Sequence, residues 1–426
     1  MRRLEIAVAG AGPAGLAAAL FLARAGHRVI VFERFETPKP LGSGLVLQPT
    51  GLSVLHALGL LDDILALGNR LDRLHGRDAH TGRTVLDARY SMKPAGRFGL
   101  AIHRAALFNV LFDAVFAEDI PIETGMDIAG LDMHGERPCL LTSRGQRLGP
   151  FDLVVDASGA RSPLRHHADI PVEPRPLAYG AIWTTLDWVG GFDERALSQR
   201  YDGASVMIGV LPVGRQTISG GDQAAFFWSL KVDTFETLRK EGLSAWKERV
   251  LGFWPESRPY VDQINGFDEV TLARYQHHTL PVPAGRGLAI IGDAAHSASP
   301  QLGQGANMAL LDAAALGVAF ASADEVPAAL QAYASGRRMH VRLFQALSRM
   351  FTPFYQSDSD VLPFLRDWLV ATIARVPPAP SILAALVSGM LADPLGSLGV
   401  DEPDWARYVS ARDLHMSRRV SLRVTG

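Results

Sequence analysis

Three glycines near the start of the chain have the spacing of a nucleotide-binding turn. The segment GAGPAG, residues 10–15, follows an apolar stretch and precedes a run rich in alanine and leucine. Gly10 permits a tight turn, Gly12 lets the backbone approach a pyrophosphate, and Gly15 lets a helix pack closely on a strand. The free N–H groups at the start of that helix attract phosphate. Glu33, about 20 residues further on, can accept hydrogen bonds from ribose hydroxyls, so a dinucleotide site is predicted.

A second segment, GLAIIGDAAHSASPQLGQGANMALLDA at residues 287–313, favours one dinucleotide over another. Asp293 ends an apolar strand and can accept hydrogen bonds from the hydroxyls of a polyol. The glycine-rich loop lets backbone N–H groups meet the edge of a flat ring, and the next helix N-terminus favours negative charge there. Reduced flavin carries such charge, whereas a nicotinamide dinucleotide does not need this second site. We therefore expect FAD. No second Gly-x-Gly-x-x-Gly follows a later strand, so a reductase with two nucleotide-binding domains is not supported.

A third segment, LVVDASGARSPLR at residues 153–165, has the pattern of a strand that ends against a ligand. The apolar run meets Asp156, and then small residues lead to Gly159. Arg161 and Arg165 are expected to be surface or structural residues. His296, in the second segment, is expected to be structural rather than a proton shuttle.

No metal site is expected. His277 and His278 are adjacent, but a third ligand at helical or hairpin spacing does not accompany them.

The elements that must position these segments follow from hydrophobic periodicity. Residues 4–9 predict a buried strand, residues 13–25 a helix and residues 28–32 a second strand, which make a βαβ unit. Between residues 178 and 230, aromatic residues alternate with others among glycine-rich turns and predict a sheet laid out as a platform. Further helices are expected at 51–67, 103–116, 235–251, 305–321 and 326–350, and further strands at 75–90 with a turn at 81–82, at 148–155 and at 288–291.

The bulk composition restricts the partners. The chain has 426 residues, 20% of them charged, and a net charge of −2, which gives no reason to expect nucleic acid as a partner. Cys139 is the only cysteine, which fits a reducing cytoplasm. No uninterrupted run reaches the roughly 20 apolar residues of a membrane-spanning helix. We expect a soluble cytoplasmic protein of two or three domains.

The C-terminal segment is unusually apolar. Residues 361–376 predict a helix with one apolar face, ended by two prolines, and residues 382–391 predict a second helix. Packing of this segment on the body, or on a partner in a homodimer, is the favoured interpretation. An interfacial membrane contact or an entrance for a lipophilic substrate is the alternative, against which the lack of a lysine-rich face counts. The apolar face would comprise Val361, Leu362, Leu365, Trp368, Leu369, Ile373 and Val376.

Taken together, these motifs resemble the FAD-dependent aromatic hydroxylases, single-component flavoprotein monooxygenases with the para-hydroxybenzoate hydroxylase fold. The three segments above stand in the family's order, and the likeness covers most of residues 1–350. HRAAL at residues 103–107 matches a family helix whose arginine contacts the flavin, here Arg104. SGLVLQPTGLSVLHALGL at residues 43–60 matches a segment that places Gln48 near the cofactor.

The resemblance implies an α/β fold: a Rossmann-like FAD-binding domain with an inserted mixed or antiparallel β-sheet substrate domain and C-terminal helices. We expect a discontinuous FAD-binding domain at residues 1–72, 98–168 and 275–350, a substrate domain at 73–97 and 169–274, and a helical segment at 351–426. The cofactor-binding residues it implies are Gly10, Gly12, Pro13, Ala14, Gly15, Glu33, Arg34, Gln48, Arg104, Ser158, Gly159, Gly292, Asp293, Pro300, Gly303, Gly305, Ala306 and Asn307.

The resemblance also implies the chemistry. NADH or NADPH would reduce FAD, O2 would form a C4a-hydroperoxide, and one oxygen would pass to an electron-rich aromatic or lipophilic substrate. The backbone around Pro300, Gly303 and Gln304 would shape the oxygen site, where N–H groups suit a developing anion. On the platform, Tyr201 and Trp228 are candidates for substrate contact, with sheet packing as the equal alternative.

One residue departs from the family's pattern. An aspartate usually precedes the glycine of the third segment and serves both FAD and NAD(P)H, but here the residue is Ser158. Serine removes a negative charge and keeps a hydroxyl. We therefore expect FAD binding to persist and the nicotinamide reaction to be the step affected.

Two other functions remain open. The first is an FAD-dependent halogenase or reductase of the same fold; the halogenases carry Trp-x-Trp-x-Ile-Pro, and WTTLDW at residues 183–188 has a different spacing. The second is a flavin-binding protein without turnover, against which the intact loop at residues 300–307 argues.

Overall fold

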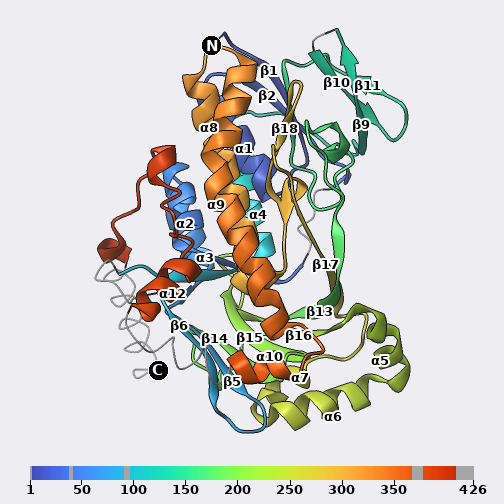
Figure 1. Ribbon diagram of the computed structural model, residues 1–426, viewed down its shortest axis with the longest axis vertical. Coiled ribbons are helices and arrows are strands. Elements are labelled where there is room, and N and C mark those ends of the chain that lie inside the picture. Colours follow the sequence, from blue (N-terminus) through green and yellow to red (C-terminus); the bar gives the residue numbers. More distant parts are fainter. Residues whose placement is uncertain (1, 38–41, 91–95, 136, 367–377, 409–426) are drawn as a thin grey trace.

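The computed structural model describes residues 2–37, 42–90, 96–135, 137–366 and 378–408 (Figure 1). A sheet that contains the N-terminal strand lies in the upper part of the molecule, behind the long helices α8 (Gly305–Ser322) and α9 (Val326–Tyr355). A larger sheet lies in the lower part, with a short helical layer beneath it.

The upper sheet is built on five parallel strands. Its order is β18-β19-β12-β1-β2-β8, and only β18 is antiparallel to its neighbour. Ile6 and Val8 of β1 point into the core with the helices, whereas Ala7 and Ala9 point into the core with the small sheet β11-β10-β9. The strands of the upper sheet are β1 Glu5–Ala9, β2 Arg28–Phe32, β8 Ile122–Glu123, β12 Leu153–Asp156, β18 Ala284–Gly285 and β19 Leu288–Ile290. Those of the small sheet are β9 Ile128–His134, β10 Arg137–Thr142 and β11 Arg147–Leu148.

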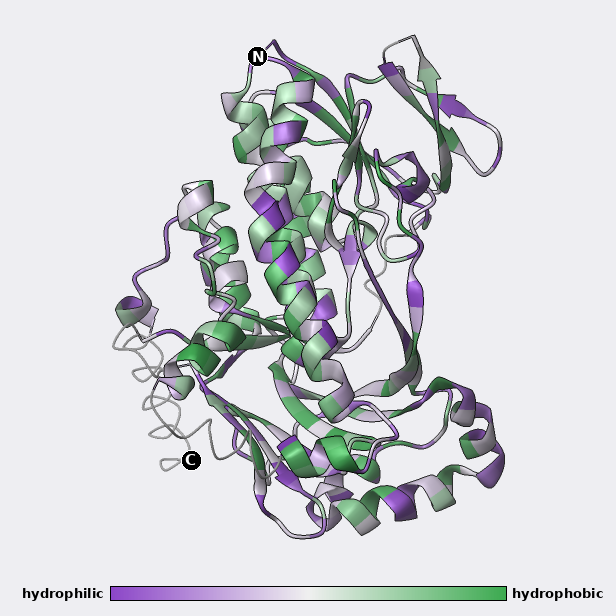
Figure 2. Ribbon diagram, viewed as in Figure 1, coloured by the Kyte–Doolittle hydropathy of each residue, from purple (hydrophilic) through white to green (hydrophobic). Residues whose placement is uncertain are grey.

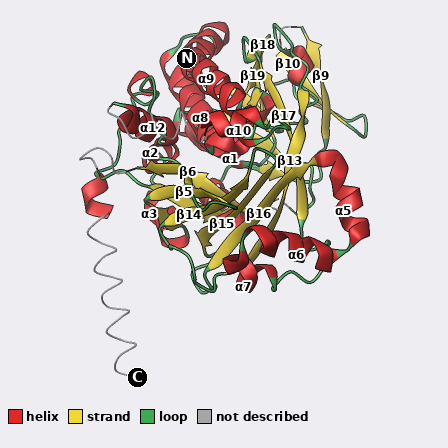
Figure 3. Ribbon diagram, turned by 60° about the horizontal axis from the view of Figure 1, so that its bottom comes forward, coloured by secondary structure: helices red, strands yellow, loops and turns green. Residues whose placement is uncertain are grey.

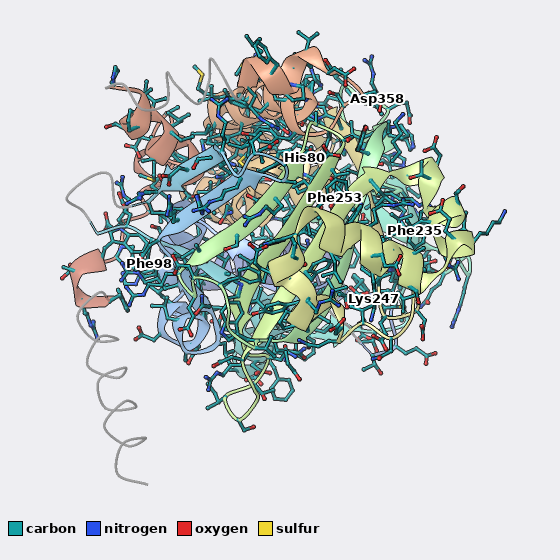
Figure 4. All side chains as sticks on the ribbon, turned by 90° about the horizontal axis from the view of Figure 1, so that it is seen from below. His80, Phe98, Phe235, Lys247, Phe253 and Asp358 are labelled. Atoms are coloured by element: carbon teal, nitrogen blue, oxygen red, sulfur yellow. The ribbon has the colours of Figure 1, made fainter. Side chains whose placement is uncertain are left out.

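The lower sheet has eight strands in the order β20-β17-β13-β16-β15-β14-β5-β6. One face carries a tryptophan-rich cluster and is covered by α5 (Phe235–Glu241), α6 (Leu243–Phe253) and α7 (Arg258–Val261) (Figure 3). Figure 4 looks onto this outer face, where Phe235 and Phe253 belong to the covering helices. The strands are β5 Arg73–Asp78, β6 Thr84–Arg89, β13 Arg175–Asp187, β14 Ala196–Asp202, β15 Val206–Gly214, β16 Gln223–Lys231, β17 Thr271–Thr279 and β20 His296–Ser297.

The inner face of this sheet packs on a third sheet, which joins the two halves of the molecule. Val213 and Ala225 of the inner face share a core cluster with Leu71 and Ala101 of the third sheet, whose order is β3-β7-β4. Gly44 lies so close that an added Cβ would stand 2.4 Å from a Val213 methyl group. The joining elements are β3 Gly44–Leu47, α2 Pro49–Ala57, α3 Leu61–Leu67, β4 Asn69–Leu71, β7 Gly99–His103 and α4 Arg104–Ala117.

The predicted βαβ unit is present, with α1 at Pro13–Arg24 between β1 and β2. Two predicted helices are broken. Residues 51–67 form α2 and α3, separated at Gly59, whose φ is +72°, and residues 235–251 form α5 and α6, separated at Gly242, whose φ is +94°. Both glycines have a positive φ, which glycine adopts at little steric cost, and the apolar pattern alone did not reveal these breaks.

The described part of the C-terminal segment packs on the body, in agreement with the favoured interpretation. Leu395, Leu398 and Trp405 are buried in the same core cluster as residues of β1, α1 and α8. Trp405 meets Phe98 edge to face, and its indole N–H donates to Glu402 at 2.7 Å. Trp368, Leu369, Ile373 and Val376 lie outside the described residues; α10 (Val361–Leu365) and α12 (Ala379–Val387) are described.

Helix α8 is long and apolar enough to cross a membrane, but 72% of it is buried within the protein. It contacts α1 on one side and the amphipathic α9, which carries polar residues along part of its surface (Figure 2), on another. Its apolar composition therefore belongs to a core helix.

Replacing Trp405 by alanine tests whether the C-terminal segment contributes to the fold. Because this side chain is 4% exposed, we expect Trp405→Ala to lower the free energy of unfolding by about 3 kcal/mol in urea titrations. Phe116→Ala, at a side chain that is 76% exposed, should change it by less than about 0.5 kcal/mol. Equal effects of the two variants would contradict the docking of this segment.

Candidate functional site

The three segments singled out in the sequence meet at one edge of the upper sheet. Strands β1, β12 and β19 are parallel neighbours, so their carboxyl ends lie at the same edge. The Ile291 N–H donates to the Asp156 carbonyl at 2.9 Å, and the Ala157 N–H donates to the Ala9 carbonyl at 2.9 Å. This edge is where ligands bind in open parallel sheets.

The glycine loop has the geometry that a pyrophosphate needs. Gly10 has a φ of +109°, and a Cβ there would stand 2.6 Å from the Ala157 carbonyl oxygen. A Cβ on Gly15 would stand 1.9 Å from the Gly10 carbonyl oxygen, so only glycine lets α1 start this close to the sheet. A Cβ on Gly12 would meet nothing within 4 Å, and no side chain caps α1. The first turn of α1, with Pro13 and Ala14, therefore presents unshielded backbone to an open cradle that fits a phosphate group.

Glu33 lies at the end of β2 beside this cradle. Its carboxylate accepts hydrogen bonds from Ala11 N at 2.8 Å and from Phe35 N at 3.1 Å, one on each oxygen. Each oxygen keeps a further lone pair, which can accept from a ribose hydroxyl. Arg34 is exposed, and its guanidinium lies 4.6 Å from the centre of the Phe35 ring.

Asp293 lies just beyond β19, near the start of α8. Its side chain is exposed, and its Oδ1 lies 3.9 Å from the position that a Gly305 Cβ would take. Desolvation by the surrounding protein raises its pKa, and the nearby charges of His296 and Arg104 act in the opposite direction. Arg104 is itself exposed at the start of α4, and its Cδ lies 2.9 Å from the position that a Gly42 Cβ would take.

The loop between Asp293 and α8 is held by side chains in addition to its own turns, one of which is closed by the Gly303 N–H donating to the Pro300 carbonyl at 2.9 Å. Asn307 accepts from Gln48 N at 2.8 Å and donates to the Gly303 and Val46 carbonyls at 3.0 and 3.2 Å. Its amide group is used within the protein, so the side chain of Asn307 shapes the loop, and the expected cofactor contact of Asn307 through its backbone stays a prediction. Gln48 is also buried, and its side-chain oxygen accepts from the Tyr90 hydroxyl at 2.6 Å.

The remaining predicted residues of this loop lie between its second turn and the first turn of α8. Pro300 and Gly305 are exposed, and Gly303 has a φ of +60° that allows the loop to turn into α8. Gly305 and Ala306 are the first residues of α8. Gln304 is the residue before α8, and its side chain is buried.

Ser158 is exposed at the end of β12, next to Gly159. Its hydroxyl and its N–H both donate to the Asp156 carboxylate, at 2.5 and 3.1 Å, and the Ser162 hydroxyl donates to the other oxygen at 2.5 Å. Burial raises the pKa of Asp156, and these hydrogen bonds oppose that shift. An aspartate at position 158 would place a second carboxylate beside Asp156, so serine suits this buried neighbour. Arg165 has the expected structural role, because it donates to the Ala294 and Ala160 carbonyls.

The residue that holds the Asp293 loop in place lies outside the predicted site residues. Asp312, buried in α8, accepts from Gly292 N at 2.9 Å, from His296 at 2.7 Å and from Arg337 Nε at 2.8 Å. Burial alone would raise the pKa of Asp312, but His296 and Arg337 lower it to about 2. An ionisable residue inside an apolar helix was the signal available in the sequence. His296 is structural, as expected.

The two proposed substrate residues belong to packing clusters. Trp228 points to the outer face of the lower sheet, where its ring centre lies 6.1 Å from that of Trp246, so the proposed substrate contact is wrong. Tyr201 is on the inner face but is 1% exposed, covers Gly76 and lies 5.6 Å from the Tyr355 ring. Neither ring is open to a ligand.

A cavity of about 370 Å³ does open on the inner face, between the residues before β3 and the strands β13 and β17. Trp183 lines it, and its indole N–H donates to the Tyr275 hydroxyl at 3.0 Å. His103 Nε2 lies 3.2 Å from the Thr185 hydroxyl, which in turn lies 2.8 Å from the Ser43 hydroxyl. The lining residues are Gly42, Ser43, Trp183, Thr184, Thr185, Glu269 and Thr271.

A family model described as FAD binding domain matches residues 3–347 of the chain. The chain belongs to the family of FAD-dependent aromatic hydroxylases. An FAD-dependent urate hydroxylase of Mycolicibacterium vanbaalenii is 30% identical to it over 78% of the chain and 84% of the relative. A 6-methylpretetramide 4-monooxygenase of Streptomyces rimosus is 29% identical over 90% of the chain and 92% of the relative.

Solved structures confirm the fold class of this flavoprotein hydroxylase. The structure of Klebsiella pneumoniae HpxO complexed with FAD and uric acid has a TM-score of 0.78, with 20% identity over 92% of the chain and 98% of that structure. The structure of 2-methyl-3-hydroxypyridine-5-carboxylic acid oxygenase has a TM-score of 0.75, with 21% identity over 90% of the chain and 96% of that structure. The predicted α/β fold, with a Rossmann-like domain, an inserted β-sheet domain and C-terminal helices, is therefore the observed fold.

Filling the cradle tests the phosphate site. Gly12→Ala should leave the stability of the FAD-free protein unchanged, because the φ of −73° is ordinary and the Cβ meets no atom. The methyl group would occupy the space for the pyrophosphate, so we expect FAD to bind at least about 10-fold more weakly in fluorescence titrations. Gly252→Ala in α6, where a Cβ also meets nothing within 4 Å, is the matched control. Unchanged FAD affinity of Gly12→Ala would place the pyrophosphate elsewhere.

Removing the charge of Asp312 tests the buried network. Asp312→Asn leaves Arg337 without its ion pair, so we expect a loss of about 3–5 kcal/mol in the free energy of unfolding at pH 7. Because the pKa of Asp312 is about 2 in the folded protein and about 3.9 in an unfolded chain, the loss should shrink as the pH falls from about 4 toward 2.

The measurement is urea unfolding at several pH values. Asp113→Asn, at an exposed position of α4, is the control and should change stability by less than about 0.5 kcal/mol. A loss that stays constant between pH 4 and pH 2 would contradict the charged state of Asp312.

Proposed function

We propose that this flavoprotein hydroxylase uses NADH or NADPH and O2 to insert one oxygen atom into a neutral, largely apolar aromatic substrate. The single observation that carries the substrate class is the inner face of the lower sheet. Cross-strand partners share a face, and one row of partners runs across the sheet from β17 to β6 without a charged residue. Its members are Thr271, Trp183, Phe227, Gly209, Gln199, Gly76 and Leu86.

The next row on the same face has the same character. Thr185, Ala225 and Leu211 are successive partners, and Leu197, Leu74 and Ala88 continue toward the edge. A ring carboxylate placed against these rows would lose its hydration without gaining a cation from the rows themselves, which is strongly unfavourable. The one charged residue that lines the cavity, Glu269, is itself an acid. A neutral ring system suits this surface.

The residues at the carboxyl edge of the upper sheet would bind and orient the flavin. When bound, the flavin supplies the redox and oxygen chemistry. The first turn of α1 would hold the pyrophosphate, Glu33 a ribose, and Asp293 the hydroxyls of the ribityl chain. Backbone N–H groups around Gly303 and Gly305 would face the ring edge, where they stabilise negative charge. The inner face of the sheet would hold the substrate and exclude water.

Three further assignments belong to this proposal. The FAD-binding domain comprises residues 1–72, 98–168 and 275–350, the substrate domain residues 73–97 and 169–274, and the helical segment residues 351–426. The insertion of β5 and β6 into the edge of the lower sheet supports this division. The protein works in the cytoplasm, where nicotinamide donors are at hand, and Ser158 affects the reduction step rather than FAD binding.

A matched pair of ligands tests the substrate class. We expect methyl 4-hydroxybenzoate to change the absorption spectrum of the bound flavin at concentrations at least about 10-fold lower than 4-hydroxybenzoate, because only the acid is anionic at pH 7. Titration of the flavin-loaded protein measures this without turnover. Tighter binding of the anion would overturn the substrate class, whereas a failure of any neutral aromatic to acquire 18O from labelled O2 would count against the monooxygenase activity itself.

A further inference from the structure

A turn in the C-terminal segment lies where two helices of the cofactor site begin. Helix α12 ends at Val387, and the chain turns at Gly389, whose φ is +75°. Residue 389 lies between Thr50, in the first turn of α2, and Gln304, the residue that precedes α8. Figure 1 shows α12 near α2, far along the sequence from it. We call residues 386–389 the C-terminal turn.

The side chain of Gln304 is held by this turn. Its Nε2 donates to the Val387 carbonyl at 3.1 Å and, at a longer distance of 3.4 Å, to the Leu386 carbonyl. Gln304 is 7% exposed, so these are buried hydrogen bonds between the loop that precedes α8 and the C-terminal segment. Since Gln304 immediately precedes α8, its position determines where the first N–H groups of α8 point.

The turn fits its place without spare room. A Cβ on Gly389 would stand 2.5 Å from the Thr50 hydroxyl oxygen and 3.1 Å from Gln304 Oε1. Thr50 is fully buried, and its hydroxyl has no hydrogen-bond partner among the described residues. Only glycine therefore allows the turn to reach both helix starts.

A second connection ties the same turn to the Asp293 loop. His340 of α9 donates from Nε2 to the Gly389 carbonyl at 2.9 Å, and its Nδ1 lies 3.3 Å from Arg337 Nη1. The guanidinium of Arg337 on one side of the ring places the histidine proton on Nε2, toward Gly389. Arg337 in turn holds Asp312, which accepts from Gly292 N.

We propose that the C-terminal turn is a positioning element of the flavin site, which sets the start of α8 through Gln304 and joins the Asp293 loop through His340. The turn touches Gln304 directly, and it reaches Gly292 through His340, Arg337 and Asp312. Both ends of the loop between Gly292 and α8 therefore share one support, the C-terminal turn, which lies beyond residue 347 and outside the family match. The inference rests on the proposed function only in taking this loop as part of the flavin site.

Two glycines of the same segment provide a matched test. Gly389 and Gly399 both have positive φ values, +75° and +59°, but a Cβ on Gly399 meets nothing within 4 Å. We expect Gly389→Ala to weaken FAD binding by at least about fivefold and to shift the visible spectrum of the bound flavin. Gly399→Ala carries the same kind of backbone strain without the contact, so it should leave both measurements close to those of the parent protein.

A second substitution separates the contact from general damage. Thr50→Ala removes the atom nearest to the new Cβ and breaks no hydrogen bond within the described residues. The double variant Thr50→Ala/Gly389→Ala should therefore regain most of the lost FAD affinity, and Thr50→Ala alone should resemble the parent. His340→Leu, which removes the donor to Gly389, should also weaken FAD binding, whereas His340→Gln, which keeps an N–H donor, should weaken it less.

The outcomes are separable. If Gly389→Ala and Gly399→Ala bind FAD equally and have the same flavin spectrum, the proposal is wrong. If Gly389→Ala does not fold, equal FAD affinity of His340→Leu and His340→Gln overturns it instead. FAD affinity decides all of these comparisons, so they stand even if no substrate is hydroxylated and the proposed function fails.

Discussion

The buried carboxylate of Asp312 is the interaction on which the arrangement of the cofactor site depends. A charge inside an apolar helix is tolerated only when it is fully paired, and three groups from three segments pair with it. Gly292 brings the end of β19, His296 brings β20, and Arg337 brings α9. Because each partner stabilises the charge, the turn after β19, strand β20 and helices α8 and α9 are held in fixed positions relative to one another.

The two large sheets contribute different surfaces to the site. The upper sheet brings the glycine loop, Glu33 and Asp293 to one edge through parallel strands, which is a requirement of backbone geometry. The lower sheet offers its inner face, whose central rows are uncharged. Its outer face is filled by the tryptophan-rich cluster under α5–α7. A polar edge rich in free backbone groups thus belongs to the upper sheet and an uncharged face to the lower sheet, where the cavity beside Trp183 opens.

Serine in place of the family's aspartate at position 158 can be explained by the neighbouring Asp156. Asp156 is buried and already accepts three hydrogen bonds, two of them from Ser158. A second carboxylate at position 158 would repel the first in a site that disfavours charge. The hydroxyl keeps the strand end in place and leaves the cofactor edge intact. The C-terminal turn makes a similar point, since Gly389 serves contacts with Thr50 and Gln304 that lie far away in the sequence.

The sequence by itself determined the features that depend on short-range spacing: the βαβ unit, the glycine loop with Glu33, the Asp293 segment and the family. Each is encoded within a few tens of residues, so a pattern suffices. Only the tertiary structure decided which face of each strand of the lower sheet is covered by helices and which lines the cavity. Alternation separates Trp183 from Trp228 by face, but it does not say which face the helices cover, because that depends on how the layers stack. The ion pair of Asp312 with Arg337, and the position of Gly389 between Thr50 and Gln304, likewise depend on contacts between segments that only folding brings together.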